Sequence, residues 1–325
     1  MNLGELLPMT LAGTVPTAPT QVLGNGVCLR WLAEGVVRVD PPAAHEGRLL
    51  LSAGVHGNET APIEWLDRLL RSIAAGRWAP KVPLLLIFGN PSAIRAGTRY
   101  VEHDMNRLFN RPLSLTPGFE ADRAAHLEQL AADFFDGARQ RLHYDLHTAL
   151  RGSRFERFAL YPWQPGRRLP AAEQRRLAAA GMQAVLLHDG PGHTFSAFTF
   201  EALGAESFTL ELGKARPFGE NEGLDLNALD GAIRALADGH EPAPPAVPLL
   251  RYRVADRVVK RSAAFVLHVA AQVENFTPLP LGLVLAQDGA EQWRVEQPNA
   301  CIVFPNPDVA IGQRAGLIVV QEVST

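Results

Sequence analysis

Cysteine is scarce in this chain of 325 residues, and its scarcity excludes two kinds of architecture. The two cysteines, Cys28 and Cys301, lie near opposite ends of the sequence, and neither has a second thiol beside it. A framework of disulfide bridges and a zinc finger with cysteine ligands are therefore both excluded.

Long apolar runs are also missing. No stretch approaches the roughly 20 apolar residues that are needed to cross a bilayer. Residues 1–17 contain no basic segment of the kind that begins a signal peptide. We therefore expect a cytoplasmic protein that does not have a membrane as its partner.

Neither sign of charge dominates. The sequence holds 31 basic and 34 acidic residues, for a formal net charge of −3, and no run of lysine or arginine forms a stripe. This balance argues against nucleic acid as a partner. Hydrophobic residues make up 47% of the chain, so we expect a packed core. The sequence carries no signal for the oligomeric state.

What the sequence does contain, from about residue 45, is an alternation of apolar runs with segments of helical periodicity. The runs at 48–54 and 82–90 enclose a helical segment at 61–76 that has a proline near its start. The same analysis predicts strands at 142–147, 157–162, 183–189 and 206–213, and helices near 117–138, 170–180, 195–203 and 225–238. This order predicts an α/β fold, with a mostly parallel or mixed sheet flanked by helices.

The two ends of the chain follow other patterns. The first 45 residues predict short strands, with a hairpin at 26–41. A stretch with four prolines in ten residues separates the α/β pattern from a segment of strands and turns with little helix. We predict a catalytic α/β domain at 1–240, a proline-rich linker at 241–248 and a smaller β-rich domain at 249–325.

Four polar residues stand at the ends of predicted strands. His56 and Glu59 follow the strand at 48–54, while His147 and Glu211 lie near the ends of two later strands. Ligands of open α/β sheets bind beyond the carboxyl ends of the strands, where loops converge. Catalytic zinc usually takes three protein ligands and keeps one open position for water. His56, Glu59 and His147 would meet this requirement for one Zn²⁺ per subunit.

The segment LHYDLH, residues 142–147, offers a rival ligand. Its i, i+4 spacing would put His143 and His147 on one face of a helix. As a strand, the segment places His143, Asp145 and His147 on one face. Asp145 is then a candidate to orient a ligand imidazole through its second N–H, and His143 is interpreted as structural. A histidine followed by a glutamate three residues later is by itself a weak signal.

Glu211 interrupts the apolar strand FTLELG, and burying an unpaired carboxylate costs several kcal/mol. An amide hydrolase needs a base that takes a proton from the attacking water and passes it to the leaving nitrogen. Glu211 fits that role. The alternative is a structural ion pair with Lys214.

The stretch GTRYVEHDMNRLFN, residues 97–110, is rich in arginine and amide groups. Arg99 and Arg107 can each bind a carboxylate through two hydrogen bonds, and Asn106 can add another. Beside a zinc site, these groups imply an anionic substrate. Without one, the stretch would be a solvated loop with salt bridges to Glu102 and Asp104.

Four ordered motifs resemble one enzyme family. GVHGNETAPIE, TRYVEHDMNRLFN, DLHTALRGSRFERFALYPW and FTLELGKARPFGEN are similar to the succinylglutamate desuccinylase and aspartoacylase family of the zinc carboxypeptidase superfamily. The match covers roughly residues 45–225, and the β-rich tail fits the second domain of that family. The phrases DLHTA and TLELGK…PFGEN resemble the desuccinylases more than the aspartoacylases.

The resemblance implies an activity and a role for each residue. It implies hydrolysis of N-succinyl-L-glutamate to succinate and L-glutamate, the last step of arginine breakdown by the succinyltransferase route. It assigns zinc to His56, Glu59 and His147, water activation to Glu211, carbonyl polarisation to Arg99, and carboxylate binding to Asn106 and Arg107. Charge and position add Lys214 and Arg151 as further substrate contacts. Two alternatives stay open: a deacylase of another N-acyl amino acid, as in aspartoacylase, and a non-catalytic relative that acts as an interaction module.

Overall fold

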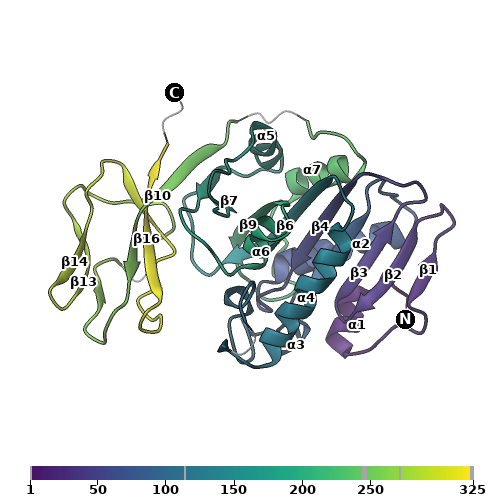
Figure 1. Cartoon of the computed structure of the whole chain (residues 1–325), viewed down its shortest axis with the longest axis horizontal. Coiled ribbons are helices and arrows are strands. Elements are labelled where there is room, and N and C mark those ends of the chain that lie inside the picture. The colour runs from purple at the N-terminus through teal and green to yellow at the C-terminus, as the bar shows by residue number, and fades with distance from the viewer. Residues whose placement is uncertain (1, 113–114, 244–246, 271, 323–325) are drawn as a thin grey trace.

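The computed structural model describes residues 2–112, 115–243, 247–270 and 272–322. A large α/β portion carries a β-rich C-terminal portion on one side (Figure 1). A thirteen-stranded sheet runs through both portions of the described chain, in the order β1-β2-β3-β5-β4-β6-β9-β7-β8-β10-β16-β15-β12. The strands β11, β13 and β14 form a second, smaller sheet.

The elements have the following bounds. The strands are β1 Thr20–Val22, β2 Cys28–Ala33, β3 Val36–Asp40, β4 Gly47–Ala53, β5 Leu84–Phe88, β6 Gln140–Ala149, β7 Arg157–Tyr161, β8 Ala184–Leu187, β9 Glu206–Lys214, β10 Leu250–Val259, β11 Val266–Leu267, β12 Thr277–Pro278, β13 Val284–Asp288, β14 Glu291–Arg294, β15 Ala300–Val303 and β16 Arg314–Gln321. The helices are α1 Leu6–Ala12, α2 Thr60–Ala74, α3 Pro91–Ala96, the 3₁₀ turn η1 Met105–Arg107, α4 Phe119–Phe135, α5 Ala171–Ala179, α6 Phe195–Glu201 and α7 Asn227–Ala237.

The centre of the sheet is parallel. Strand β4 pairs in parallel with β5 and β6, and β6 pairs in parallel with β9. These strands are buried on both faces, which is why they read as continuous apolar runs in the sequence. Strands β3 and β7 run antiparallel to their neighbours β5 and β9. The sheet is therefore mixed, which confirms the predicted fold class.

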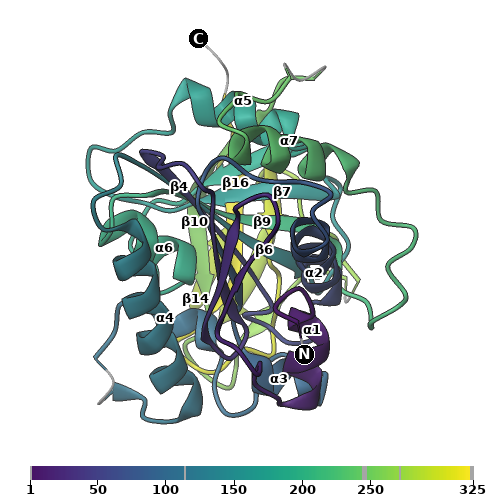
Figure 2. The same cartoon turned by 90° about the vertical axis from the view of Figure 1, so that its right-hand side faces the viewer.

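Helices cover both faces of the sheet (Figure 2). On one face, α4 and α6 pack their apolar side chains, among them Leu127 and Phe195, against Leu50 and Leu85 of the central strands. On the other face, α2 and α7 join α1 and α5 in a larger core. The sheet is thus a buried middle layer, and its carboxyl edge is the place where loops meet.

The structure agrees with most predicted elements from residue 48 onward, within a few residues at each end, but it corrects the N-terminal prediction. Residues 6–12 form helix α1, which buries Leu6 and Met9, whereas short strands were predicted for this region. Helix α3 was also missed, although Asn90 caps it, Pro91 begins it and Gly97 ends it with a φ of +64°. The predicted linker at 241–248 lies partly outside the described residues, because 244–246 are not described.

The C-terminal portion is joined to the α/β portion by hydrogen bonds between strands. Strand β10 pairs in parallel with β8 and antiparallel with β16. The smaller sheet packs against this extension around Leu285, Trp293 and Ile318. No helix in the described part of the chain is long and apolar enough to span a bilayer. The division into domains stays a prediction.

Candidate active site

A short loop between β4 and α2 carries the first two candidate ligands. Gly54 adopts a φ of +66°, a conformation that side chains disfavour. Gly57 approaches α3 so closely that a Cβ atom would lie 2.1 Å from the carbonyl carbon of Ala93. The two glycines therefore allow the loop to turn tightly, and this turn places His56 and Glu59 over the end of β4.

The structure brings the three predicted ligands together. His56, Glu59 and His147 are buried, and one ligand atom from each lies within 4.8 Å of the others. Glu59 faces both imidazoles: its Oε1 is 2.9 Å from His56 Nδ1, and its Oε2 is 2.9 Å from His147 Nδ1. Ligands about 2 Å from a tetrahedral zinc ion lie roughly 3.3 Å apart, so this spacing fits a metal.

A second carboxylate holds the far nitrogen of each imidazole. His56 Nε2 lies 3.0 Å from Asp104 Oδ1, and His147 Nε2 lies 2.9 Å from Asp145 Oδ2. Such contacts fix the ring orientation and leave Nδ1 to bind the metal. Asp145 was predicted in this role. Asp104 was not, although its place in the motif DMNR, beside Arg107, was a signal.

An unsatisfied atom supports the metal assignment. His56 Nδ1 is buried and makes no hydrogen bond within the described residues, despite its closeness to Glu59. Buried polar atoms are almost always paired, so an orphan needs an explanation. A divalent cation between His56, Glu59 and His147 supplies one.

The electrostatics of the site favour a cation. Burial lowers the pKa of His147, but the carboxylates of Asp145 and Glu59 outweigh burial and leave this pKa well above its usual range. Burial likewise raises the pKa of Glu59, but His56 and His147 outweigh it and hold that pKa far below its usual range. A proton and a metal ion compete for the same Nδ1 lone pair, so a site that favours the first also suits the second.

Glu211 lies beside this group. It stands opposite His147 in the register between β9 and β6, its side chain is 8% exposed, and its Oε2 has no hydrogen-bond partner among the described residues. Burial first, and then the nearby charge of Glu59, raises the pKa of Glu211 to about 7. Within the described chain, Glu211 forms no ion pair with Lys214. The structure therefore does not support the alternative of a structural ion pair between these two residues. A carboxyl that titrates near neutrality suits a general base.

Arg99 also reaches the site. Its guanidinium donates to Glu59 Oε1 at 3.1 Å and to Asp104 Oδ2 at 3.5 Å. Of the two salt bridges considered in the alternative of a solvated loop, the one to Asp104 is present, whereas Glu102 accepts from the backbone N–H of Phe119. Arg99 is partly exposed, so it lies between the buried ligands and solvent.

A buried carboxylate that the sequence analysis missed holds the loop after Arg99. Glu120 of α4 is fully buried and accepts from the backbone N–H groups of Val101, Glu102 and His103, at 2.7 to 3.4 Å. The side chain of Asn90 donates to the same carboxylate at 3.3 Å. Glu120 therefore fixes the loop that presents Arg99 and Asp104. The sequence indicates this role of Glu120 only weakly, because no local sequence pattern relates a helix residue to three backbone amides of another segment.

The two predicted carboxylate binders differ in exposure. Asn106 is buried, and its Oδ1 accepts from the backbone N–H of Phe195 at 3.0 Å. Arg107 is exposed and donates to the backbone oxygen of Asn106 at 2.7 Å. Asn106 thus joins its loop to the start of α6, and the guanidinium of Arg107 remains open to an anion.

The remaining candidates lie around this centre. Lys214 is the exposed last residue of β9, and Arg151 is partly buried two residues beyond β6. His143 is fully buried, with Ser52 Oγ and Thr199 Oγ1 each 2.8 Å from one of its nitrogens, and burial lowers its pKa to about 4. Both ring nitrogens of His143 thus have hydroxyl partners, which agrees with its interpretation as structural. His193 lies at the surface, 3.1 Å from the carbonyl oxygen of Phe109.

The motif PFGEN fastens the loop after β9 to helix α2. Asn221 donates to Thr60 Oγ1 at 2.8 Å and to Glu64 Oε2 at 3.2 Å, while the N–H of Gly219 donates to Glu64 Oε1 at 2.7 Å. Thr60 in turn donates to the carbonyl of Arg216 at 2.6 Å. Since Glu59 immediately precedes Thr60, the network steadies one candidate ligand.

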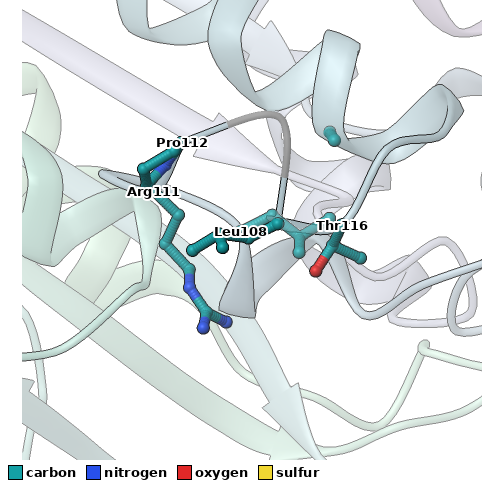
Figure 3. Close-up of a pocket in the computed structure, with 6 residues that line it drawn as sticks. Leu108, Arg111, Pro112 and Thr116 are labelled. Atoms are coloured by element: carbon teal, nitrogen blue, oxygen red, sulfur yellow. The ribbon is translucent and has the colours of Figure 1, made fainter.

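A small hollow lies beside the loop that follows Arg107. It is lined by Leu108, Arg111, Pro112, Leu115, Thr116 and Ala121, several of which are seen in Figure 3. Its volume is about 10 Å³, which holds roughly one water molecule. None of the candidate ligands lines it, so it is not a substrate site.

Comparison with known proteins identifies relatives along nearly the whole chain. Residues 45–237 match the succinylglutamate desuccinylase/aspartoacylase catalytic domain, and residues 248–322 match the AstE/AspA barrel-sandwich hybrid domain. A succinylglutamate desuccinylase of Pseudomonas fluorescens is 53% identical over 98% of this chain and 97% of its own length.

Two solved structures share the complete architecture. The succinylglutamate desuccinylase of Chromobacterium violaceum superimposes with a TM-score of 0.89 at 44% identity, and covers 100% of this chain and 99% of its own. The enzyme of Vibrio parahaemolyticus gives a TM-score of 0.92 at 35% identity, with coverage of 97% and 94%.

Proposed function

Because this chain belongs to the succinylglutamate desuccinylase/aspartoacylase family, we propose that it hydrolyses N-succinyl-L-glutamate to succinate and L-glutamate. The relatives named above support this substrate. The observation that carries the proposal is the meeting of His56, Glu59 and His147 beside Glu211, whose Oε2 has no hydrogen-bond partner among the described residues. A non-catalytic relative would need none of these four groups at one place.

We propose that His56 and His147 hold one Zn²⁺ through Nδ1, together with the carboxylate of Glu59. The ion, when bound, supplies Lewis acidity that lowers the pKa of water and polarises a carbonyl. Asp104 and Asp145 keep the two imidazoles oriented. The identity of the metal as zinc rests on the family and on the nitrogen and oxygen ligands.

Glu211 acts as the general base and then as the general acid. Its carboxylate takes a proton from the attacking water, and the same carboxyl later gives this proton to the nitrogen of the leaving glutamate. In the metal-free site, burial and the charge of Glu59 raise the pKa of this carboxyl to about 7, and a carboxyl that titrates near neutrality suits proton transfer in both directions. Arg99 donates to the oxyanion that forms at the scissile carbonyl.

The substrate carries three carboxylates, and we propose that the cationic groups around the centre bind them. Asn106 and Arg107 bind one carboxylate, with two parallel hydrogen bonds from the guanidinium. Arg151 and Lys214 are proposed as further contacts on the basis of charge and position. Catalysis in the cytoplasm likewise stays a prediction from the sequence.

A comparison of substrates tests this function. The purified protein, supplied with zinc, should release succinate from N-succinyl-L-glutamate with a higher kcat/KM than it releases acetate from N-acetyl-L-aspartate. The reverse order would favour the aspartoacylase alternative. No release from any N-acyl amino acid, with stoichiometric zinc bound, would refute the proposal.

A further inference from the structure

Arg314, the first residue of β16 in the C-terminal portion, is partly buried and has no ion-pair partner among the described residues. By contrast, Arg251 pairs with Glu322 at 2.7 Å. Removing a guanidinium from water costs free energy when no anion compensates its charge. We therefore expect Arg314 to bind an anionic ligand.

Aromatic contacts place Arg314 on the face of the sheet that carries Glu211. Its Cζ lies 5.7 Å above the ring of Phe304, and that ring is 5.9 Å from the ring of Phe158. Phe158 stands directly opposite Glu211 in the pairing of β7 with β9. Residues opposite each other on antiparallel strands project from the same face, so the chain of contacts leads from Arg314 to the catalytic centre.

Phe304, whose ring lies under the guanidinium of Arg314, has an unfavourable backbone conformation. Phe304 has a φ of +55°, which is rare for a residue with a bulky side chain. Asn275, which is buried, accepts from the N–H of Phe304 at 2.7 Å and donates its own N–H to the carbonyl of Gly152 at 2.9 Å. Gly152 lies in the loop that leaves β6. The ring is therefore fixed relative to the strand that ends near His147.

The surroundings of Arg314 carry an excess of positive charge. Burial lowers its pKa to about 10, and the nearby charges of Arg107 and Arg257 add to this effect. Burial, together with Arg314, also lowers the pKa of His188 to about 3, so this imidazole is neutral. Asp189 is the nearby acid, and it is ion-paired with Arg257. Within the described residues, neither Arg107 nor Arg314 forms an ion pair with a carboxylate, although Asp104 and Asp189 lie near them.

We propose that Arg314 binds a terminal carboxylate of the substrate, either that of the succinyl group or that of the glutamate side chain, next to the carboxylate bound by Arg107. This inference rests on the proposed function. It makes Arg314 a specificity-determining residue that the C-terminal portion supplies to the active site. The ring of Phe304 orients the flat face of the guanidinium and leaves its N–H groups free to donate.

Matched substrates test the assignment. The wild-type protein is first assayed with N-succinyl-L-glutamate, and absence of succinate release at that step would refute the proposed function itself. Arg314→Met is then compared with the wild type on this substrate, on N-butyryl-L-glutamate, which lacks the acyl carboxylate, and on N-succinyl-L-norvaline, which lacks the side-chain carboxylate.

We expect Arg314→Met to raise the KM for N-succinyl-L-glutamate roughly tenfold to a hundredfold, as for a lost charged hydrogen bond. The increase in KM should be absent with the analogue that lacks the carboxylate bound by Arg314. That analogue therefore identifies which carboxylate Arg314 binds. An unchanged KM, or an equal increase with all three substrates, would overturn the proposal.

Two further variants serve as controls for misfolding. Arg314→Lys keeps the charge but loses the forked geometry, so its KM should lie between those of Arg314→Met and the wild type. Arg253→Met removes an exposed arginine of the adjacent strand β10 and should leave the kinetics unchanged. A KM for Arg314→Lys as high as that for Arg314→Met would contradict a role of the charge.

Discussion

Replacing Glu211 by glutamine should make the protein more stable at alkaline pH and nearly inactive. The carboxyl is buried, and one of its oxygens has no hydrogen-bond partner in the described structure. The shift of its pKa from 4.5 to about 7 corresponds to a cost of about 3 kcal/mol for the charged form. In Glu211→Gln that charge is absent.

The sign of the pH dependence follows from proton binding. In the unfolded chain, Glu211 loses its proton near pH 4.5, whereas in the fold it keeps the proton until about pH 7. The folded state therefore binds more protons between these values, and the stability of the parent protein falls as the pH rises through this window. The glutamine amide does not titrate. The variant should thus gain about 2 kcal/mol over the parent between pH 5 and pH 8.

Urea unfolding of the metal-free protein at pH 5 and at pH 8 measures this gain. Zinc-loaded samples, assayed for succinate release, should show turnover reduced by about 10² to 10⁴-fold with the zinc content retained. The comparison between the two pH values removes any constant cost of burying the amide. A stability difference that does not change with pH would refute the electrostatic argument, and turnover above a tenth of the parent would refute the role as base.

Three further changes test the surroundings of this carboxyl. His56→Ala should reduce the zinc content measured by elemental analysis from one equivalent to none, and a retained equivalent would contradict its role as a ligand. Asp104→Asn should weaken zinc binding about 10- to 100-fold in a chelator competition, because Nε2 of His56 loses its carboxylate; unchanged affinity would show that the contact does not matter. Glu120→Gln should lower the free energy of unfolding in urea by about 2 kcal/mol, since an amide cannot accept from three N–H groups equally well, and unaltered unfolding would contradict its hold on the loop.

The sequence alone allowed the central group to be predicted. His56 and Glu59 follow a buried strand, and His147 and Glu211 lie near the ends of two others. The period of a strand, together with the rule for strand ends, placed all four at one edge. The alternation within β6 likewise placed Asp145 beside His147. Local patterns were sufficient here because the geometry of parallel strands is regular.

The other parts of the site depend on contacts between distant segments. Asp104 reaches His56 across 48 positions, and Glu120 holds a loop 17 to 19 positions before it. Arg314 comes near the centre only through Phe304 and the turn held by Asn275. No periodicity encodes such pairings. Helix α1 was mistaken for strands because seven residues without a capping side chain give a weak signal.

Strand β10 has a consequence for how the chain can be divided. Its first residues, from Leu250 to Arg253, pair with β8, while the strand as a whole pairs with β16. A protein cut in the preceding proline-rich stretch would leave the edge of β8 bare, and such an edge invites pairing with other molecules. Each half would also lose hydrogen bonds that the other provides. We therefore expect the two portions to fold together and neither to be stable alone.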